Sequence, residues 1–321
     1  MLKSLFTRGA VAAIALAGLT TAAAAQMDLK IMAPAAPGGG WDGTARSMQQ
    51  ALTGAGIAKG VQVTNVPGAG GTIGLAQLAS SSKGDGSLLM VNGFVMVGAI
   101  LLNKSPVTLA QTTPIARLTA EALVVVVPAD SPIKTGKDLA ERLKADPAKV
   151  TWAGGSAGGA DHIMAALFAG TVGADASKIN YIPFSGGGEA LAALLGGRVT
   201  AGVSGYGEFE GQIKSGKLRV VGVTSPNRLG NAPDAPTFKE QGIDLEVLNW
   251  RSVVAPPGIT PEQRKALGDA IDRMVKSKEW AEILKARGWD DAYLASAEFE
   301  TFLKTEEARV AKVMKEVGLI K

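Results

Sequence analysis

The feature that most constrains the fold is a glycine-rich loop that recurs between a strand-like run and a helical pattern. In its first occurrence, an apolar run at residues 29–35 is followed by Pro-Gly-Gly-Gly-Trp-Asp at residues 37–42 and by helical spacing at residues 44–52. The same order returns at residues 61–82, 150–170 and 179–197. Strands separated by helices predict an α/β fold with a parallel sheet covered by helices.

Glycine loops that open helices are suited to bind anions, because the first N–H groups of a helix lack partners within it and carry partial positive charge. Three consecutive glycines cost backbone entropy on folding, which favours approach of a ligand to Gly39 and Gly40 over a plain turn. We expect Asp42 to interact with the N–H groups of its own helix. If Asp42 faced the cleft, it would favour a ligand with an amino group. Trp41 either closes over the ligand or packs against the second part of the chain.

The first 25 residues have the pattern of a cleaved secretory signal peptide. Lys3 and Arg8 give a basic start, residues 10–19 are apolar but too few to span a bilayer, and residues 23–25 are the small residues that precede a cleavage site. No later run is long and apolar enough to span a membrane. We therefore expect a soluble mature chain that is exported to the periplasm.

The composition excludes several classes of chemistry. The chain has no cysteine, which rules out disulfides, thiolate metal sites and thiol nucleophiles, and its one histidine rules out a histidine-rich metal site. The formal net charge of +4 is reduced further when the two basic residues of the leader are removed. This charge is too small to indicate a nucleic-acid-binding protein. We expect no cofactor, no metal and no nucleic-acid partner.

The chain is expected to form two lobes. Residues 123–128 are the most apolar run after the leader and predict a buried strand that enters a second unit. The strand-like residues 218–224 are interpreted as the return crossing. A capping box with proline at the first helical position, Thr260–Gln263, opens amphipathic helices that complete the first unit. The predicted lobes are residues 26–124 with 224–321, and residues 125–223, with a cleft where the strand ends meet.

Two loops resemble nucleotide-binding or catalytic motifs without meeting their requirements. Residues 67–74 lack both the Gly-x-Gly-x-x-Gly spacing of a dinucleotide site and the Lys-Ser or Lys-Thr pair of a P-loop. Gly154–Gly158 matches the Gly-x-Ser-x-Gly nucleophile elbow, with Ser156 as the candidate nucleophile of a secreted serine hydrolase. The available base, His162, is expected six residues later in the same helix, so the two side chains should point apart. A hydrolase remains the alternative to a binding protein.

Two further glycine-rich segments, residues 184–188 and 203–208, follow strand-like runs and are expected to be either plain turns or ligand loops. Glu189 is placed to interact favourably with the first turn of its helix. Arg251 either pairs with a ligand carboxylate or forms a structural ion pair near the hinge.

Six segments stand out together: Ala-Pro-Gly-Gly-Gly-Trp-Asp (36–42), Asn-Val-Pro-Gly-Ala-Gly-Gly-Thr-Ile-Gly (65–74), Gly-Ser-Ala-Gly-Gly (155–159), Ile-Lys-Ser-Gly-Lys-Leu-Arg (213–219), Pro-Thr-Phe-Lys-Glu-Gln-Gly (236–242) and Asn-Trp-Arg-Ser-Val-Val-Ala-Pro-Pro-Gly (249–258). In this order and spacing, the chain resembles the solute-binding proteins of tripartite tricarboxylate transporters, also called Bug receptors. The resemblance covers essentially the whole mature chain. Trp41 stands where many relatives have a small residue, which places the chain nearer the tricarboxylate type.

The resemblance implies a type II periplasmic-binding-protein fold, with two lobes, a central cleft and two connecting strands. It implies a monomeric receptor, not an enzyme, that captures a small di- or tricarboxylate, most readily citrate or a C4-dicarboxylate, for membrane permease subunits. The carboxylates would be held by backbone N–H groups and hydroxyls, often through ordered water. The residues that the resemblance assigns to the ligand are Gly39, Gly40, Trp41, Asp42, Gly68, Ala69, Gly70, Gly71, Thr72, Ser156, Ala157, Gly158, Gly159, Ser204, Gly205 and Tyr206.

Overall fold

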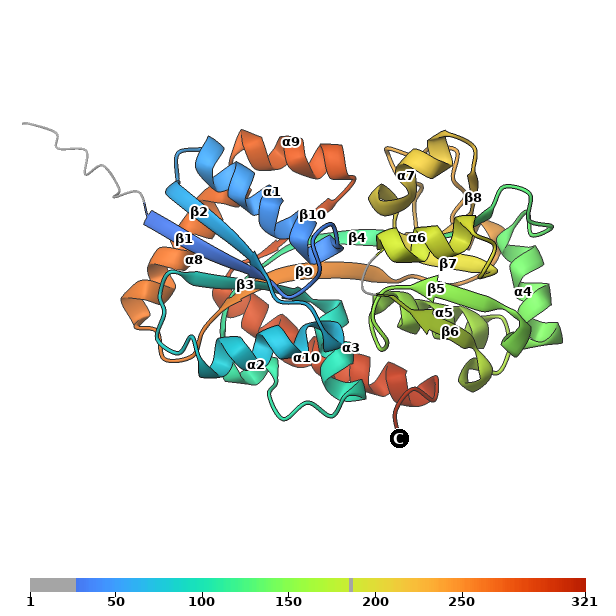
Figure 1. Cartoon of the computed structure of the whole chain (residues 1–321), viewed down its shortest axis with the longest axis horizontal. Coiled ribbons are helices and arrows are strands. Elements are labelled where there is room, and N and C mark those ends of the chain that lie inside the picture. Colours follow the sequence, from blue (N-terminus) through green and yellow to red (C-terminus); the bar gives the residue numbers. More distant parts are fainter. Residues whose placement is uncertain (1–26, 185–186) are drawn as a thin grey trace, which may run out of the picture.

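Two α/β lobes lie side by side and share strand β4 (Thr113–Pro128), which extends from one lobe into the other (Figure 1). The structure is a computed structural model that describes residues 27–184 and 187–321. The expected signal peptide at residues 1–25 lies outside the described residues. No described helix is long and apolar enough to cross a membrane.

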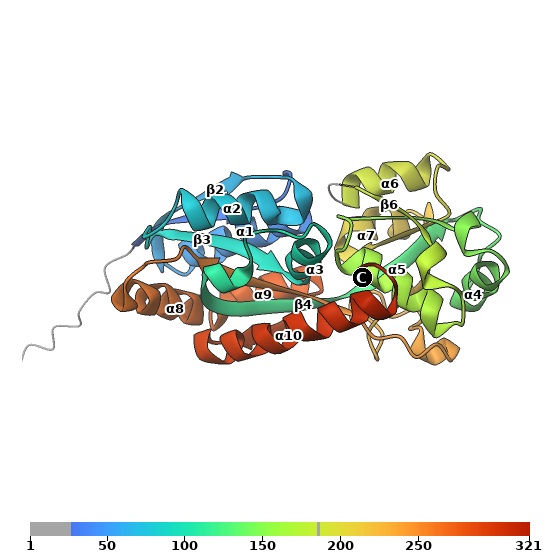
Figure 2. The ribbon, with the colours of Figure 1, turned by 90° about the horizontal axis from the view of Figure 1, so that it is seen from below.

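In the first lobe, helices cover a mixed sheet with the order β2-β1-β3-β9-β4, and β10 pairs with the other edge of β4. β1 pairs in parallel with β2 and β3, while β9 runs antiparallel to β3 and β4. Besides β4, the strands are β1 (Met27–Ala33), β2 (Ala58–Asn65), β3 (Leu88–Gly93), β9 (Leu248–Ala255) and β10 (Asp290–Leu294). The helices are α1 (Gly40–Gly54), α2 (Thr72–Ser80), α3 (Phe94–Leu102), α8 (Pro261–Val275), α9 (Lys278–Arg287) and α10 (Ser296–Glu316), of which α10 runs beside β4 (Figure 2).

The second lobe repeats this plan with the order β6-β5-β7-β4, and β8 pairs with the same half of β4. Its strands are β5 (Thr151–Gly154), β6 (Asn180–Pro183), β7 (Ala201–Gly205) and β8 (Leu218–Val223). Its helices are α4 (Gly136–Ala145), α5 (Ala160–Thr171), α6 (Gly187–Leu195) and α7 (Tyr206–Lys214). Short 3-10 turns lie at Ala69–Gly71, Leu109–Gln111, Pro147–Lys149, Ala176–Lys178 and Lys239–Gln241.

In the first lobe β1 lies between β2 and β3, and in the second lobe β5 lies between β6 and β7. Next to β3 in the sheet lies β9, and next to β7 lies β4, so that each lobe ends on a strand that crosses between the lobes. This is the two-lobed α/β architecture with two connecting strands, β4 and β9, that the sequence predicts. Because the parallel strands of each lobe end near the junction, the loops that follow them meet there.

The return from the second lobe is made by β9, not by residues 218–224 as predicted. Residues 218–223 form β8, which pairs antiparallel with the second-lobe half of β4. The chain then stays on the second lobe, where Phe238 is fully buried against Phe168, with ring centroids 5.0 Å apart. The chain therefore leaves the second lobe after residue 224, and it enters that lobe along β4.

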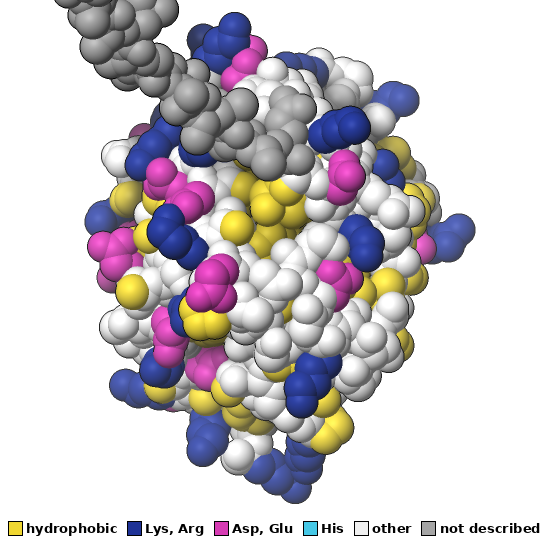
Figure 3. Space-filling model, turned by 90° about the vertical axis from the view of Figure 1, so that its left-hand side faces the viewer, with side chains coloured by type: hydrophobic (Ala, Val, Ile, Leu, Met, Phe, Trp, Pro, Cys, Tyr) yellow, Lys and Arg dark blue, Asp and Glu magenta, His cyan; other side chains and the backbone are white. Residues whose placement is uncertain are grey.

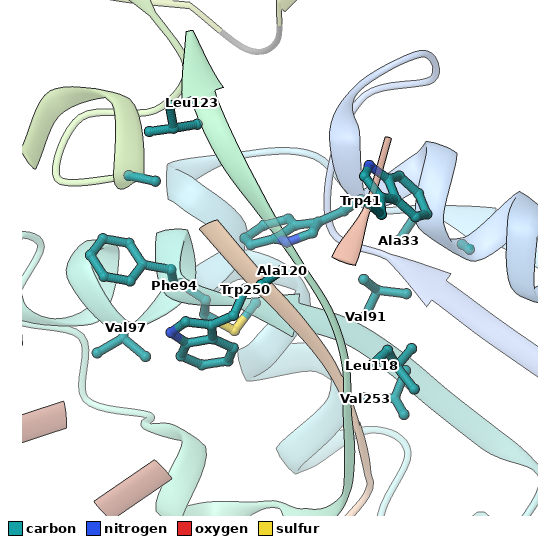
Figure 4. Packing of buried hydrophobic residues seen from close by; sticks show 14 of the residues in the cluster. Ala33, Trp41, Val91, Phe94, Val97, Leu118, Ala120, Leu123, Trp250 and Val253 are labelled. Carbon is teal, nitrogen blue, oxygen red and sulfur yellow. The ribbon is translucent and has the colours of Figure 1, made fainter. Parts of the chain in front are cut away.

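Local sequence explains why these elements form. The run Val124–Val127 is fully buried, as expected for a strand that is paired on both edges and covered on both faces. The predicted capping box opens α8, where the side chains of Thr260 and Gln263 each accept the other's backbone N–H. Where α3 meets β9, Phe94, Val97 and Trp250 pack together (Figure 4).

The free end of the first lobe carries basic and acidic side chains interspersed with one another among its described residues (Figure 3). Mixed signs of charge are typical of a solvated surface. This face therefore does not have the clustered basic side chains that indicate nucleic-acid binding.

Candidate functional site

A cavity of about 380 Å³ lies between the two lobes. Its walls are the segments that follow β1, β2 and β3 in the first lobe and β5, β6 and β7 in the second, together with Asn249 and Arg251 of β9. The cavity brings together most of the residues that the sequence assigns to a ligand. Those that line it are Gly39, Gly40, Trp41, Gly68, Ala69, Gly70, Gly71, Ser156, Ala157 and Ser204.

On the first-lobe wall, α1 begins at Gly40 without a side-chain cap. Its N-cap residue, Gly39, has an extended backbone and no side chain that could accept the first N–H groups of the helix. A Cβ on Gly40 would lie 2.7 Å from Nη2 of Arg251, so glycine is needed for this close approach. α2 likewise begins after Gly71 without a side-chain cap. Uncapped helix starts are suited to accept a ligand carboxylate.

Trp41 packs into the first lobe instead of reaching the second. Its side chain is only 8 % exposed and belongs to a buried hydrophobic cluster that includes residues of both lobes. Gly71 lies directly against the indole, since a Cβ there would be 2.6 Å from Cζ3 of Trp41. Trp41 therefore packs against the loop that contains Gly71 and also lines the cavity.

Asp42 is not among the residues that line the cavity, and its assignment to the ligand stays a prediction. Its Oδ2 accepts the backbone N–H of Gly38 and Nε–H of Arg46, each at 2.9 Å, and its Oδ1 accepts Nδ2–H of Asn65 at 2.9 Å. Burial alone would raise the pKa of Asp42, but these donors outweigh burial and lower it. The carboxylate thus bonds to the residue before Gly39 and fixes the loop, instead of capping N–H groups within α1.

The second-lobe wall is built around the loop that follows β5. The backbone N–H of Gly155 donates to Oδ2 of Asp161 at 2.6 Å, and the hydroxyl of Tyr181 donates to the carbonyl of Gly155 at 2.8 Å. These two bonds fix the loop so that Ser156 lies at the cavity. Ser204, 5 % exposed on β7, supplies a second hydroxyl from the same lobe.

Three other assigned residues have structural contacts outside the cavity. The hydroxyl of Thr72 donates to the carbonyl of Ala69 at 2.9 Å, within its own loop. Gly205 lies against the carboxylate of Glu121, and Tyr206 is buried in the second-lobe core. Their positions after glycine loops predicted ligand contact, but none of the three is among the residues that line the cavity.

Gly158 and Gly159 form a contact between the lobes instead of a ligand wall. The carbonyl of Gly158 lies so close to Gly98 of α3 that a Cβ on Gly98 would overlap with it. A Cβ on Gly159 would lie 3.0 Å from Cγ1 of Val95. Neither glycine is among the residues that line the cavity, and their assignment to the ligand stays a prediction.

The geometry needed by a serine hydrolase is not formed by Ser156 and His162. Ser156 lies in the loop before α5, which begins only at Ala160, so the two residues do not share a helix as predicted. Nδ1 of His162 accepts the backbone N–H of Gly158 at 3.1 Å, and its ring stacks on Tyr181 with centroids 4.2 Å apart. Burial lowers the pKa of His162 to about 4, so the ring is neutral near pH 7 and is held by structural contacts.

Arg251 forms the structural ion pair considered for it and also lines the cavity. Its guanidinium forms a buried ion pair with Glu121 and lies over the ring of Trp289, with 5.0 Å from Cζ to the ring centroid. The same side chain lines the cavity and is only 4 % exposed. Among the described residues, its Nη1 has no hydrogen-bond partner. Arg251 is thus a structural ion pair that also faces the cavity.

Several polar residues that line the cavity were not predicted from the sequence. These are Asn103, Asp161, Glu208 and Asn249. Glu189, which was considered only for its interaction with the first turn of its own helix, also lines the cavity. Asp161 and Glu208 each lie in the first helical turn after a glycine loop, as Asp42 does. That shared spacing was the available signal, but it does not show which of the three carboxylates turns toward the cavity.

The cavity offers groups that bind without making or breaking covalent bonds. It provides N–H groups at helix starts, the hydroxyls of Ser156 and Ser204, and one guanidinium. Within the described residues, no group of three His, Asp or Glu side chains is arranged to hold a metal ion. This arrangement suits the capture of a small polar ligand.

Comparison with known proteins gives a consistent result. Residues 44–319 match the family described as the tripartite tricarboxylate transporter family receptor. The chain is 30 % identical over 294 residues to protein BugT of Bordetella pertussis, covering 90 % of this chain and 89 % of BugT. It is similar to the structure of the periplasmic binding protein BugD, with a TM-score of 0.82, 26 % identity, and coverage of 92 % of this chain and 99 % of BugD. The structure of MatC from Rhodopseudomonas palustris with bound malate has the same fold, with a TM-score of 0.79, 23 % identity, and coverage of 89 % and 98 %.

The family match spans both lobes and includes the loops that line most of the cavity. The family consists of transporter receptors that bind solutes and are not enzymes. This chain belongs to the tripartite tricarboxylate transporter receptor family of periplasmic solute-binding proteins.

Proposed function

We propose that this chain captures a small di- or tricarboxylate, citrate or a C4-dicarboxylate first, and delivers it to the permease subunits of a tripartite tricarboxylate transporter. The observation that carries the proposal is the cavity between the lobes, where the uncapped start of α1 at Gly39 and Gly40 is opposed by the hydroxyls of Ser156 and Ser204. A ligand that bonds to both lobes favours the closed arrangement over an open one.

The size and chemistry of the cavity support this ligand class. A volume of about 380 Å³ lies within the range of small-molecule sites, roughly 300–1,000 Å³. Backbone N–H groups and hydroxyls form charge-assisted hydrogen bonds to carboxylates without a cofactor. MatC has the same fold, and its structure contains bound malate. This is compatible with a C4-dicarboxylate as the ligand of this chain but does not assign one to it.

The proposal includes export and a membrane partner. The basic, apolar and small-residue segments of the first 25 residues support export and removal of a leader. The description of the family supports permease subunits as the partner. We infer that the mature receptor acts as a monomer in the periplasm.

A thermal-shift screen of organic acids tests the proposal. A ligand present at 100 times its Kd stabilises the native state by about 2.7 kcal/mol, which raises the melting temperature measurably. We expect citrate or a C4-dicarboxylate to stabilise the wild type, and Ser156→Ala to weaken this effect while Ser215→Ala on the surface of the second lobe does not. If no di- or tricarboxylate stabilises the protein at millimolar concentration, the proposal is wrong.

The alternative of a serine hydrolase has a separate test. Labelling by an active-site serine phosphonate that is lost in Ser156→Ala would favour hydrolysis over binding. We expect no labelling, because Nδ1 of His162 accepts the N–H of Gly158, and burial lowers the pKa of the ring to about 4, which makes it a weak base.

A further inference from the structure

The end of the chain, after α10, reaches the second lobe. α10 runs along β4 in the first lobe, and the C-terminus lies beside α5 of the second lobe (Figure 2). A Cβ placed on Gly318 would lie 3.2 Å from Cβ of Ser177, which belongs to the turn Ala176–Lys178 after α5. A segment attached to the first lobe therefore contacts the second lobe, at a distance from the strands that connect them.

α10 is firmly attached to the first lobe. The carboxylate of Glu306, which is 6 % exposed, accepts Nε1–H of Trp250 at 2.9 Å and Nε–H of Arg309 at 2.7 Å. Trp250 lies on β9 where this strand pairs with β4, and Phe299 and Val310 of α10 are buried in the core. We therefore expect α10 to move as one body with the sheet of the first lobe.

The residues after α10 are held in place by the end of the helix. The N–H of Gly318 donates to the carbonyl of Lys315 at 3.0 Å, and the N–H of Leu319 donates to the carbonyl of Met314 at 2.8 Å. With Gly318 at φ +73°, these bonds form a Schellman motif. Leu319 and Ile320 are half-buried and pack against a hydrophobic cluster that includes residues of both lobes. Chain ends are ordered where they are tied down in this way.

The turn that meets Gly318 is itself fixed within the second lobe. Oδ1 of Asp175 accepts the N–H of Ser177 at 3.1 Å and its hydroxyl at 2.6 Å. The turn follows the C-terminal end of α5, and Gly159 lies just before the N-terminal end, where a Cβ would be 3.0 Å from Cγ1 of Val95 on α3. The first lobe thus contacts the second at both ends of α5.

α5 connects this contact with the cavity. Ser156, in the loop before α5, and Asp161, in its first turn, both line the cavity. A displacement of α5 would therefore displace part of the second-lobe wall. Because Gly318 and Ser177 belong to different lobes, their contact is lost when the lobes move apart about β4 and β9.

We propose that residues 318–320 are a latch, a segment of the first lobe that contacts the turn at Ser177 and stabilises the closed arrangement of the two lobes. A contact that exists only in the closed arrangement raises the closed fraction of the free protein, the affinity for the ligand, or both. The latch is not among the residues that line the cavity. The inference goes beyond the proposed function and rests on it only where ligand binding is the quantity measured.

A chain that ends at Val317 tests the latch by removing it. We expect a larger radius of gyration of the ligand-free protein in small-angle X-ray scattering, or binding of the tightest acid in the thermal-shift screen that is weaker by about tenfold. Ser177→Phe in the full chain, which places a bulky side chain beside Gly318, should act in the same direction. Ser177→Ala keeps the Cβ and removes only the hydroxyl that bonds to Asp175, so it is the matched control and should change neither quantity.

The combination of the two changes shows whether they act on one contact. Ser177→Phe in the shortened chain should bring no further change, because the segment that the phenylalanine would displace is already absent. If shortening the chain alters neither the radius of gyration nor the affinity, the inference is wrong. Additive effects of the two changes would also contradict it.

The chain has no cysteine, so an introduced pair of cysteines reports the contact directly. Ser177→Cys combined with Gly318→Cys brings two Cβ atoms close to the separation of roughly 3.5–4.5 Å that a disulfide requires. We expect this pair to oxidise in the ligand-free protein and the disulfide to slow release of a bound acid by about tenfold, until a reductant restores the rate. Ser177→Cys combined with Lys304→Cys, at an exposed position of α10, is the control and should stay reduced.

These measurements separate the latch from the proposed function. Oxidation of the pair and scattering of the ligand-free protein need no ligand. If no carboxylate binds, the proposed function fails, and these two measurements still decide on the latch. If the Ser177→Cys, Gly318→Cys pair stays reduced like the control, the end of the chain does not contact the second lobe in solution and the inference is wrong.

Discussion

The guanidinium of Arg251 on β9 and the carboxylate of Glu121 on β4 form a buried ion pair where these two strands cross between the lobes. The pair is reinforced by Trp289, whose Nε1–H donates to Oε2 of Glu121 at 2.9 Å and whose ring lies beneath the guanidinium. Because Arg251 also lines the cavity, the hinge and the site share one group of charges. The connection between the lobes is therefore electrostatically coupled to the region where the ligand is expected.

Removal of one partner of this pair should be strongly destabilising. Arg251→Ala leaves Glu121 buried without its cation, and breaking a buried pair in this way costs about 3–5 kcal/mol. Urea denaturation of the ligand-free protein measures the loss. Lys144→Ala, which removes an exposed partner of Glu141, is the control and should cost no more than about 1 kcal/mol. A similar small loss for both variants would show that Arg251 does not stabilise the hinge.

Asp42 should contribute stability that disappears in acid. Its pKa is lowered in the folded protein, so the carboxylate favours folding above its unfolded pKa, and this contribution is lost as the pH falls through the folded pKa. We expect Asp42→Asn to be less stable than the wild type at about pH 7, by about 1.5–3 kcal/mol for the loss of hydrogen bonds to a charged group. The gap should close progressively below about pH 4, as Asp42 becomes protonated in both states.

Thermal melts at neutral and acidic pH measure this gap. Asp138→Asn is a useful comparison, because Asp138 also has a lowered pKa but caps α4 at a fully exposed position. We expect a smaller gap for that variant. A gap for Asp42→Asn that does not change with pH would mean that its charge is not what stabilises the loop.

The sequence was sufficient to locate the loops that form the cavity. The order of strand, glycine loop and helix places Gly39, Gly70 and Ser156 at carboxyl ends of parallel strands, and such ends meet at one edge of a sheet. The carboxyl ends of parallel strands can be located without knowledge of tertiary contacts. This explains why the first residues of each loop lie at the cavity wall.

The orientation of residues further along each loop could not be predicted from the sequence. Gly158 faces α3 of the other lobe, and this depends on how the lobes approach one another. Asp161 reaches the cavity because α5 begins at Ala160 instead of within the glycine motif. The return crossing was misplaced for a similar reason: β8 and β9 are both strand-like, and only the pairing with β4 distinguishes them.

Gly98 should be needed for close approach of the lobes. A Cβ at this position would overlap with the carbonyl of Gly158, so Gly98→Ala should force α3 away from the second lobe. We expect weaker binding, by about tenfold or more, of the tightest acid in the thermal-shift screen, and a larger radius of gyration in small-angle X-ray scattering with that acid present.

A matched substitution separates this effect from helix propensity. Gly170 lies in α5 with no atom within 4 Å of a Cβ added there, so Gly170→Ala should stabilise its helix by about 0.5–1 kcal/mol and leave binding unchanged. Unchanged affinity and radius of gyration for Gly98→Ala would mean that the contact between Gly98 and Gly158 does not limit closure.

Asp161 and His162 should affect stability with opposite dependence on pH. Burial raises the pKa of Asp161 from 3.8 to about 7, so the folded state holds a proton that the unfolded state releases, and stability falls as the pH rises through this window. Burial lowers the pKa of His162 from 6.5 to about 4, so the unfolded state holds the extra proton, and stability rises with pH between these values. Between about pH 4 and about pH 6.5 the two contributions oppose one another in the wild type.

Single substitutions should expose each slope. We expect the free energy of unfolding to rise more steeply with pH in Asp161→Asn, and to fall with pH in His162→Gln relative to the wild type, each by up to about 1.4 kcal/mol per pH unit. Urea denaturation at several pH values between about 4.5 and about 6.5 measures the slopes, and Glu141→Gln on the same lobe should run parallel to the wild type. Because asparagine can still accept the N–H of Gly155 and glutamine that of Gly158, a change in slope reports the lost proton and not a lost hydrogen bond. Parallel curves for both variants would show that neither group titrates differently in the folded and unfolded protein.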